Sequence, residues 1–464
     1  MIAPDLAAWA VGELDVPAEV QHAAKRHLLD GLGNAVAGAR AGAAAPAVSV
    51  AAGLGGPAEA TILGCTDRVS APAAALANGT LVHALDFDDT HAGGLVHATA
   101  VVLPAVLAVG EQVGARGRDL LDAAVVGYEV ACRVAGAAPH RFHAGGLHAT
   151  MVAGVFSSAA VAARLMGLDA ATTTSALGIA GSQAGGLLAF LATGASTKQL
   201  HPGFASQSGI LAARLAAAGA TGPETVFDGP HGVYDALATG QVDTGFILRD
   251  LGSTEAATWQ TTQIGIKPWP TCQLAHATMA AAQVALAQAG VDASAVRAVS
   301  AQVHPDSASV VCAADRDLTR PASPYAAKFS LPWSVAAILV DGAVGIDTYA
   351  EANLARPELT ELAGRITWSL TPGAGVAADA AGDVVLTLAD GRTVTGHVDR
   401  SPGGGSAPLS EDGLFAKLAG NVADTGLAER LRAAVDALPS AGDATEILSL
   451  AAAAAVVPSE ETTA

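Results

Sequence analysis

The chain of 464 residues has little cysteine, few aromatic side chains and little positive charge. Its four cysteines are far apart and form no CxxC pair, which argues against a disulfide framework or a cysteine-rich zinc site. With 24 Lys and Arg against 43 Asp and Glu, the formal net charge is -19, so the chain has no basic surface for nucleic acid. Aromatic residues make up 4% although 51% of the chain is hydrophobic, so alanine supplies most of the apolar mass. Because alanine permits close helix approach, we expect many tightly packed helices.

Two further absences concern membranes and export. The first residues, "MIAPDLAAWAVGELD", contain early acids and no basic n-region, so they do not resemble a signal peptide. Residues 170–197 carry no charge and are long enough to span a bilayer, but they include a threonine run, Gln183 and several glycines, and no aromatic belt flanks them. A helix buried inside a protein has the same hydropathy. We therefore expect a cytoplasmic protein with reduced thiols and no membrane segment.

The pattern of apolar residues predicts a mainly α fold in two domains, since 464 residues exceed what one core usually supports. Apolar residues at helical spacing predict helices at 17–38, 117–136 and 155–169, and Ser70 followed by Pro72 predicts a capped helix over 71–86. Beyond Trp259 the pattern alternates as in strands, at 295–305, 365–370 and 382–399, with Asp390-Gly391 as a hairpin turn and a helix at 332–342. Helical patterns return at 414–422 and 427–438.

These patterns predict a large all-helical domain and a smaller α+β domain. The helical domain comprises residues 1–262 and is completed by residues 400–456, which we expect to pack against its first part. The α+β domain comprises residues 263–399. Residues 457–464 are expected to form a disordered tail.

The stretch "HALDFDDTH", residues 83–91, concentrates three carboxylates, two imidazoles and a hydroxyl in a chain poor in charge. In helical geometry Asp86 and Thr90 lie one turn apart and face the same way, while Asp88 and Asp89 are expected to cap and solvate the helix end. A metal site is an alternative, but no HExxH motif or second cluster with ligand spacing accompanies it. A metal-free acid/base site is the third interpretation.

Four other stretches place reactive side chains in turns framed by Gly or Pro, which favours the acid/base interpretation. Each histidine alone is more often a satisfied structural residue than a catalyst. Together they point to a site that handles anions, because a buried lysine needs an anionic partner. The residues are His148, Lys198 with His201, Lys267 with Cys272 and His276, and Tyr325 with Lys328.

In order along nearly the whole chain, "HALDFDDTH…HATAVVLPA", "GLHATMVAGVFSSAAVAARLMGLD", "STKQLHPGFASQSGILAARLAAAGATGP" and "KPWPTCQLAH" resemble the MmgE/PrpD family. That family includes 2-methylcitrate dehydratases, cis-aconitate decarboxylases and iminodisuccinate epimerases. The resemblance implies a helical domain, an α+β lid domain, a homodimer, and neither metal nor cofactor. It is specific for the family and leaves the reaction open.

Family active-site positions fall on residues that the motifs already single out. Because histidine needs the least tuning to act as a base near neutral pH, we expect His97 and His148 to be the acid/base pair, with Asp86 orienting or polarising one of them. Thr90, Lys198, Lys267, Cys272, His276 and His201 are expected to bind the substrate. Three departures stand out: His97-Ala98-Thr99 replaces His-Pro-Ser, Gly146-Leu147-His148 replaces Gly-Phe-His, and Cys272 stands where animal-type decarboxylases are expected to have histidine.

The leading hypothesis is therefore a cofactor-independent lyase that dehydrates a citrate-like polycarboxylate by proton transfer at the carbon beside a carboxylate. The alternative is an epimerase or decarboxylase of a related dicarboxylate or tricarboxylate. From other classes, a metal-dependent hydrolase would use Asp86, Asp88, Asp89 and His91, and a non-catalytic scaffold would tolerate loss of His148 or Lys198. The predicted partner is a small anionic substrate, with neither nucleic acid nor membrane involved.

Overall fold

A computed structural model describes residues 1–65 and 68–456 and divides them into two compact units. The helical unit comprises Met1–Leu188, Lys198–Ile264 and the segment that begins at Ser410. The α+β unit comprises Ala189–Thr197 and Gly265–Leu409. The predicted mainly α fold, with a large helical part and a smaller α+β part, is confirmed. The predicted disordered tail, 457–464, lies outside the described residues.

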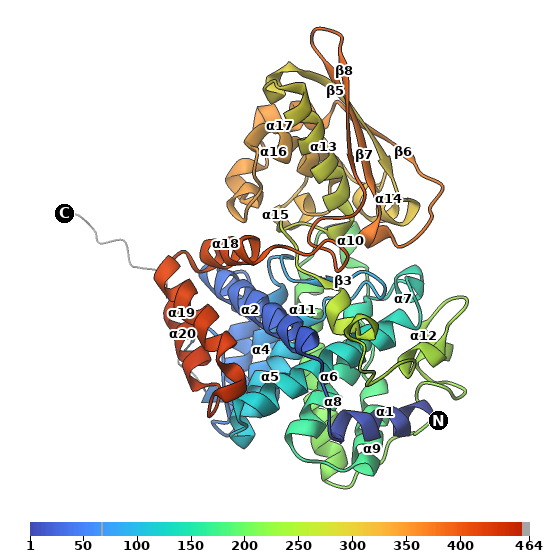
Figure 1. Ribbon diagram of the computed structural model, residues 1–464, viewed down its shortest axis with the longest axis vertical. Helices are drawn as coiled ribbons and strands as arrows, with labels where there is room; N and C mark the ends of the chain where they lie inside the picture. Colours follow the sequence, from blue (N-terminus) through green and yellow to red (C-terminus); the bar gives the residue numbers. More distant parts are fainter. Residues whose placement is uncertain (66–67, 457–464) are drawn as a thin grey trace, which may run out of the picture. The chain divides into compact units, whose positions relative to one another are not determined.

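The helical unit is built almost entirely of helices, which Figure 1 labels. They are α1 (Ile2–Val11), α2 (Ala18–Arg40), α3 (Ala45–Leu54), α4 (Ala71–His83), α5 (Thr99–Val113), α6 (Gly117–Gly136), α7 (Arg141–Ala144), α8 (Ala149–Leu165), α9 (Ala170–Gly181), α11 (Thr197–Ala217), α12 (Val233–Leu237), α18 (Glu411–Val422), α19 (Thr425–Asp436) and α20 (Thr445–Ala455). Two-residue strands β1 (Ala60–Thr61), β2 (Arg68–Val69), β3 (Thr90–His91) and β4 (Ile264–Gly265) complete the set.

Small residues let the helices of this unit approach closely. A Cβ added to Gly79 of α4 would lie 2.8 Å from the Cα of Gly203 in α11, and one added to Gly203 would lie 2.3 Å from the carbonyl oxygen of Leu76. The two backbones therefore touch, which a larger side chain would prevent. This contact places the first turns of α11, with Lys198 and His201, beside α4.

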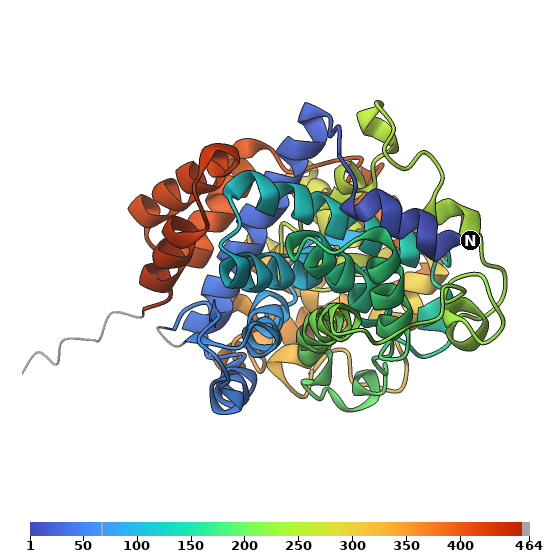
Figure 2. The ribbon, with the colours of Figure 1, turned by 90° about the horizontal axis from the view of Figure 1, so that it is seen from below.

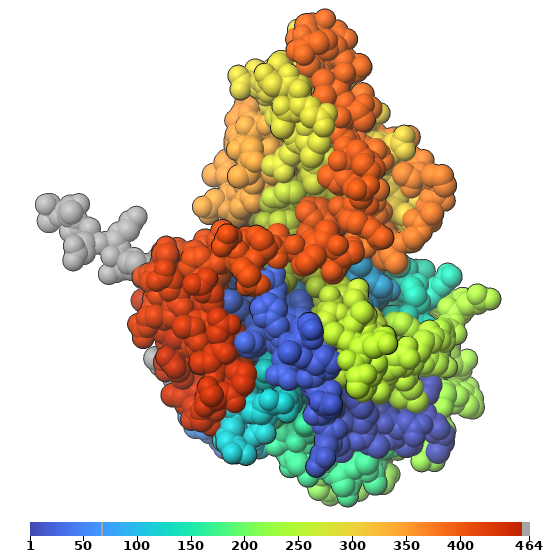
Figure 3. Space-filling view, viewed as in Figure 1, coloured from blue at the N-terminus to red at the C-terminus, as the bar shows by residue number. Residues whose placement is uncertain are grey.

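The C-terminal helices pack on the N-terminal part of the same unit, since α18, α19 and α20 all contact α2. Figures 2 and 3 show these red helices beside the blue N-terminal segment. The Lys417 ammonium of α18 lies 2.7 Å from Asp30 of α2 and donates to the carbonyl of Phe87 at 2.6 Å. A buried ion pair thus joins residues far apart in the sequence.

The α+β unit contains a four-stranded sheet in the order β6-β5-β7-β8. Its strands are β5 (Val296–Val303), β6 (Ile366–Leu370), β7 (Gly382–Leu388) and β8 (Thr393–Val398), and its helices are α10 (Phe190–Thr193), α13 (His276–Ala289), α14 (Pro305–Val311), α15 (Pro324–Ala327), α16 (Leu331–Asp341) and α17 (Pro357–Ala363). β5 pairs in parallel with β6 and antiparallel with β7, where Ala301 faces Val384. The predicted hairpin is present as β7 and β8, with Gly391 at φ +88 in the turn.

Two local predictions need correction. Helix α4 ends at His83, and Asp86 has a left-handed backbone (φ +53), so Asp86 and Thr90 do not share a helical turn. Ser70 precedes α4, but in the described chain its hydroxyl makes no capping bond; the Glu59 carboxylate accepts from the N–H of the first helical residue, Ala71, at 2.9 Å.

The uncharged segment 170–197 is interrupted by helix ends rather than forming one long helix. Within the described residues, a bilayer-spanning length and composition occur in no individual helix, although α2 and α3 together pass that test across a 95° bend.

Candidate active site

Four pieces of the helical unit carry the clustered side chains: the end of α4, the loop from residue 84 to 98, the start of α8 and the first turns of α11. The cluster is buried, because the exposed fraction is 7% for His97, 5% for Lys198 and below that for His148 and His201. Charges and imidazoles in such a place interact more strongly than in water.

Asp86 and Lys198 form a buried ion pair, in which Lys198 Nζ donates to Asp86 Oδ1 at 2.6 Å. The left-handed backbone at Asp86 turns the chain directly after α4, a conformation that aspartate tolerates better than most residues. The pair satisfies the requirement for an anionic partner that the sequence placed on Lys198.

His97 is held by its Nδ1, which donates to the carbonyl of Asp89 at 2.8 Å and lies 3.3 Å from the hydroxyl of Thr90. Because a carbonyl can only accept, Nδ1 carries the proton, and neutral His97 has its lone pair on Nε2. The loop therefore fixes which nitrogen of His97 can accept a proton.

His148 precedes α8 and lies between two partners. Its Nδ1 is 3.1 Å from Nδ1 of His201, and its Nε2 is 3.2 Å from the hydroxyl of Thr150, which also accepts from the His97 N–H at 3.1 Å. Burial, the Lys198 charge and neighbouring imidazoles hold the pKa of His148 well below its usual value. Burial also lowers the pKa of His201 to about 4. Both rings are thus neutral at pH 7 and able to accept protons.

The prediction that Asp88 and Asp89 cap and solvate a helix end is wrong in part, since both are fully buried. Asp89 does serve a helix start: it accepts from the backbone N–H of Thr99 at 3.0 Å and from the Thr99 hydroxyl. Burial raises the pKa of Asp89 to about 7. Asp88 accepts from His83 Nδ1 at 2.8 Å.

The structure brings six of the predicted residues together and keeps three in the other unit. Asp86, Thr90, His97, His148, Lys198 and His201 share the cluster. Lys267, Cys272 and His276 belong to the α+β unit, where Lys267 and His276 are fully buried and His276 Nε2 lies 3.2 Å from the carbonyl of Thr271. The Cys272 N–H donates to the carbonyl of Lys328 at 3.0 Å, which fastens this loop to its neighbour.

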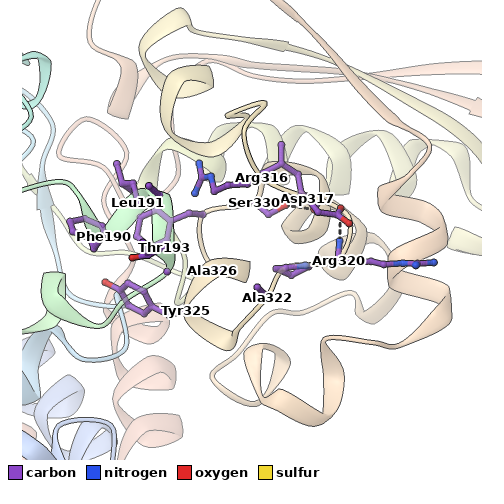
Figure 4. A pocket seen from close by; sticks show the side chains of 15 residues that line it. Phe190, Leu191, Thr193, Arg316, Asp317, Arg320, Ala322, Tyr325, Ala326 and Ser330 are labelled. Atoms are coloured by element: carbon purple, nitrogen blue, oxygen red, sulfur yellow. Dashed lines mark hydrogen bonds between the residues drawn. The ribbon is translucent and has the colours of Figure 1, made fainter.

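The α+β unit also has a small cavity of about 170 Å³ (Figure 4). Phe190, Leu191, Tyr325 and Phe329 give it apolar walls. Arg316 lies at its edge but donates to the carbonyl of Val310. The cavity includes Tyr325 from one of the motif stretches but none of the nine residues assigned to the site, so it is distinct from the cluster that those residues form.

Sequence reasoning missed His83 and Thr150 as members of the cluster. The rings of His83 and His97 have centroids 4.6 Å apart, and those of His83 and His148 are 5.8 Å apart. His83 opens the stretch that drew attention, so its spacing to Asp88 was available as a signal. Thr150 carried none, because its role depends on the position of His97.

Two sets of side chains in the cluster are close enough to consider as cation ligands. One nitrogen each of His83, His97 and His148 lies within 4.8 Å of the others, as do ligand atoms of His83, Asp86, Asp88 and His97. However, Asp86 already binds the Lys198 ammonium and Asp88 binds His83, so a metal ion would compete with both and be repelled by Lys198. The arrangement suits proton transfer better than metal binding.

Comparison with known proteins gives the family. The MmgE/PrpD N-terminal domain matches residues 5–244, and the MmgE/PrpD C-terminal domain matches residues 269–439. The chain belongs to the MmgE/PrpD family, as its motifs indicated.

Relatives of this chain include two proteins named cis-aconitate decarboxylase and one named as similar to that enzyme. The chain is 28% identical to cis-aconitate decarboxylase of Aspergillus terreus, over 94% of this chain and 92% of that protein. It is 29% identical to the cis-aconitate decarboxylase-like protein oryM of Aspergillus oryzae, over 94% of each. It is 30% identical to cis-aconitate decarboxylase of Mus musculus, over 78% of this chain and 74% of that protein.

Proposed function

We propose that this protein is a carboxy-lyase that needs no cofactor and decarboxylates cis-aconitate or a closely related tricarboxylate. The sequence analysis ranked dehydration first and gave epimerisation or decarboxylation as the alternative, and the names of the relatives favour decarboxylation. The observation that carries the proposal is the buried cluster in which His97, His148 and Lys198 meet.

Decarboxylation requires positive charge and hydrogen-bond donors where negative charge develops, and the cluster contains both. When the bond to the departing carboxylate breaks, its electron pair stays on carbon and spreads onto a neighbouring carboxylate, which gains charge. The proposal assigns the stabilisation of that charge to the Lys198 ammonium and the Thr90 hydroxyl, both of which are buried. Asp86 holds the ammonium in place before the substrate arrives.

The reaction also consumes a proton, since a new C–H bond replaces the C–C bond and CO₂ leaves. His97 or His148, as an imidazolium, donates that proton from nitrogen to carbon and becomes neutral. Before substrate binds, His148 is favoured in its neutral form, because burial and the Lys198 charge lower its pKa. A substrate with several carboxylates reverses this field, so binding is expected to bring a proton with it.

The assignments in the α+β unit remain part of the proposal. Lys267 with its following loop, including Cys272 and His276, is proposed to bind substrate carboxylates. Lys267→Met is expected to raise KM more than it lowers kcat, and the opposite pattern would contradict this role. The proposed homodimer is testable by light scattering on the purified protein.

The deciding experiment follows the purified protein by NMR in deuterated water with cis-aconitate, citrate, 2-methylcitrate and iminodisuccinate. We expect loss of CO₂ from cis-aconitate with one deuterium in the product. Loss of water from citrate or 2-methylcitrate would favour the dehydratase, and deuterium exchange without net conversion would favour an epimerase. If no substrate reacts, the proposal fails.

Matched variants connect the activity to the cluster. His148→Gln and His97→Gln are expected to lower kcat by about 10²–10⁴-fold, the usual contribution of an acid/base side chain. His22→Gln is the control, because His22 is exposed and its Nε2 lies 3.3 Å from the carboxylate of Glu411. Equal rates for all three variants would show that the buried imidazoles have no catalytic role.

A further inference from the structure

His83 is a third imidazole in the cluster, next to those of His97 and His148. It occupies the last position of α4 and is fully buried. Its ring is 4.6 Å from that of His97 and stacks at 29° on that of His148, 5.8 Å away. It cannot touch solvent, so any role it has passes through its neighbours.

A buried carboxylate fixes the orientation of this ring. His83 Nδ1 lies 2.8 Å from Asp88 Oδ2, and both side chains are fully buried. Because a carboxylate only accepts, Nδ1 donates, and the lone pair of neutral His83 is on Nε2. Among the described residues no protein group hydrogen-bonds that Nε2. Burying an imidazole nitrogen without a partner is costly, so its retention calls for an explanation.

We propose that the Asp88–His83 pair holds a proton for the neighbouring acid/base histidines, His97 and His148. This role rests on the proposed function, in which each turnover consumes one proton. An Asp–His pair can fulfil it because the carboxylate stabilises an imidazolium and fixes its tautomer.

The transfer step is a simple proton movement. The Nε2–H bond of the His83 imidazolium breaks and an N–H bond forms on His97 or His148, with no change in oxidation state. The ring centroids of His83 and His97 are 4.6 Å apart. Rings this close can exchange a proton directly or through one bridging water. Solvent then restores the proton to His83 through the same path.

The charge state of His83 depends on every group around it. Asp86 and Asp88 come from the loop after α4, His97 precedes α5, His148 precedes α8, and Lys198 with His201 come from α11. The Asp88 carboxylate favours the imidazolium, while the Lys198 ammonium and a protonated neighbour oppose it. Asp88 is therefore the group whose removal has the most direct effect.

The test compares Asp88→Asn and His83→Gln with a histidine from the same stretch. His91 is also buried, but its ring nitrogens are satisfied by Gln260 and by the N–H of Gly94. In Asp88→Asn we expect kcat to fall about 10- to 100-fold with little change in KM, and the alkaline limb of the pH–rate profile to move down by about one unit or more. Asp88→Glu should recover part of the rate. His91→Gln should keep the wild-type pH profile even if it is less stable.

Two outcomes would overturn the proposal. One is a pH profile of Asp88→Asn or His83→Gln that coincides with those of the wild type and His91→Gln. The other does not depend on turnover: in nitrogen-15 NMR of the histidine-labelled protein, the His83 signals, assigned by their absence in His83→Gln, must show a neutral ring protonated at Nδ1 above neutral pH, and a neutral His83 ring protonated at Nε2 contradicts the proposal. Because this spectrum does not depend on turnover, it tests the pair even if cis-aconitate is not the substrate.

Discussion

Breaking the ion pair between Lys417 and Asp30 is expected to destabilise the helical unit strongly. Both side chains are almost fully buried, the charges are 2.7 Å apart, and the ammonium also lies 3.9 Å above the ring of Phe87. Lys417→Met keeps the apolar stem on Phe87 but leaves the Asp30 carboxylate buried without its cation. Burial and the nearby Asp88 raise the pKa of Asp30, so apart from Lys417 the surroundings of this carboxylate disfavour its charged form. Losing one member of a buried pair typically costs about 3–5 kcal/mol.

The assay is urea unfolding at pH 7, followed by circular dichroism in the far and near ultraviolet. The double variant Asp30→Asn with Lys417→Met should recover most of the loss, because it removes both charges and leaves an amide that Asn34 can still contact. The reasoning is refuted if Lys417→Met alone lowers the free energy of unfolding by less than about 1 kcal/mol. It is also refuted if the double variant is less stable than Lys417→Met.

Three other predictions follow from the same structure. Burial lowers the pKa of His91 to about 4. The unfolded chain therefore binds more protons than the folded chain between pH 4 and 6.5. The contribution of His91 to the free energy of unfolding is complete above pH 6.5 and falls by about 3 kcal/mol toward pH 4. His91→Gln should accordingly show a shallower dependence of stability on pH. Chelation with EDTA is expected to leave kcat unchanged within about twofold, whereas loss that a divalent ion restores would favour the metal-dependent hydrolase. Gly203→Ala should cost about 1–3 kcal/mol through its clash with Leu76, while Gly420→Ala, in a helix where no described atom lies within 4 Å of the new Cβ, should be neutral or stabilising in thermal unfolding.

Local periodicity was enough to predict much of the fold. The helix expected over 117–136 is α6, Gly117–Gly136, because its apolar face and its glycine end are both local signals. The hairpin around Gly391 follows from two alternating runs and a turn that requires a positive φ. The return of α18 to α2 was expected from composition alone, and the ion pair of Lys417 with Asp30 explains it physically.

The candidate site was less predictable, because burial of a carboxylate depends on a partner that the local sequence does not contain. Asp86 meets Lys198, which is 112 positions away, and Asp89 meets Thr99 across a loop. The prediction that Asp86 and Thr90 lie one helical turn apart was wrong, because it extended the helical period beyond His83, where α4 ends. Six of the nine predicted residues therefore lie together in the helical unit, while their individual contacts required the three-dimensional structure.

Proton balance connects the cluster to the choice between the family's reactions. Dehydration and epimerisation take one proton from carbon and return one to the substrate, so a pair of bases that exchange roles is sufficient for either. Decarboxylation takes up a proton from outside in every turnover, which requires a path from solvent to the donor. The His97 side chain is 10% exposed, whereas that of His83 has no exposed surface. A proton entering at His97 and held at the Asp88–His83 pair would supply that need.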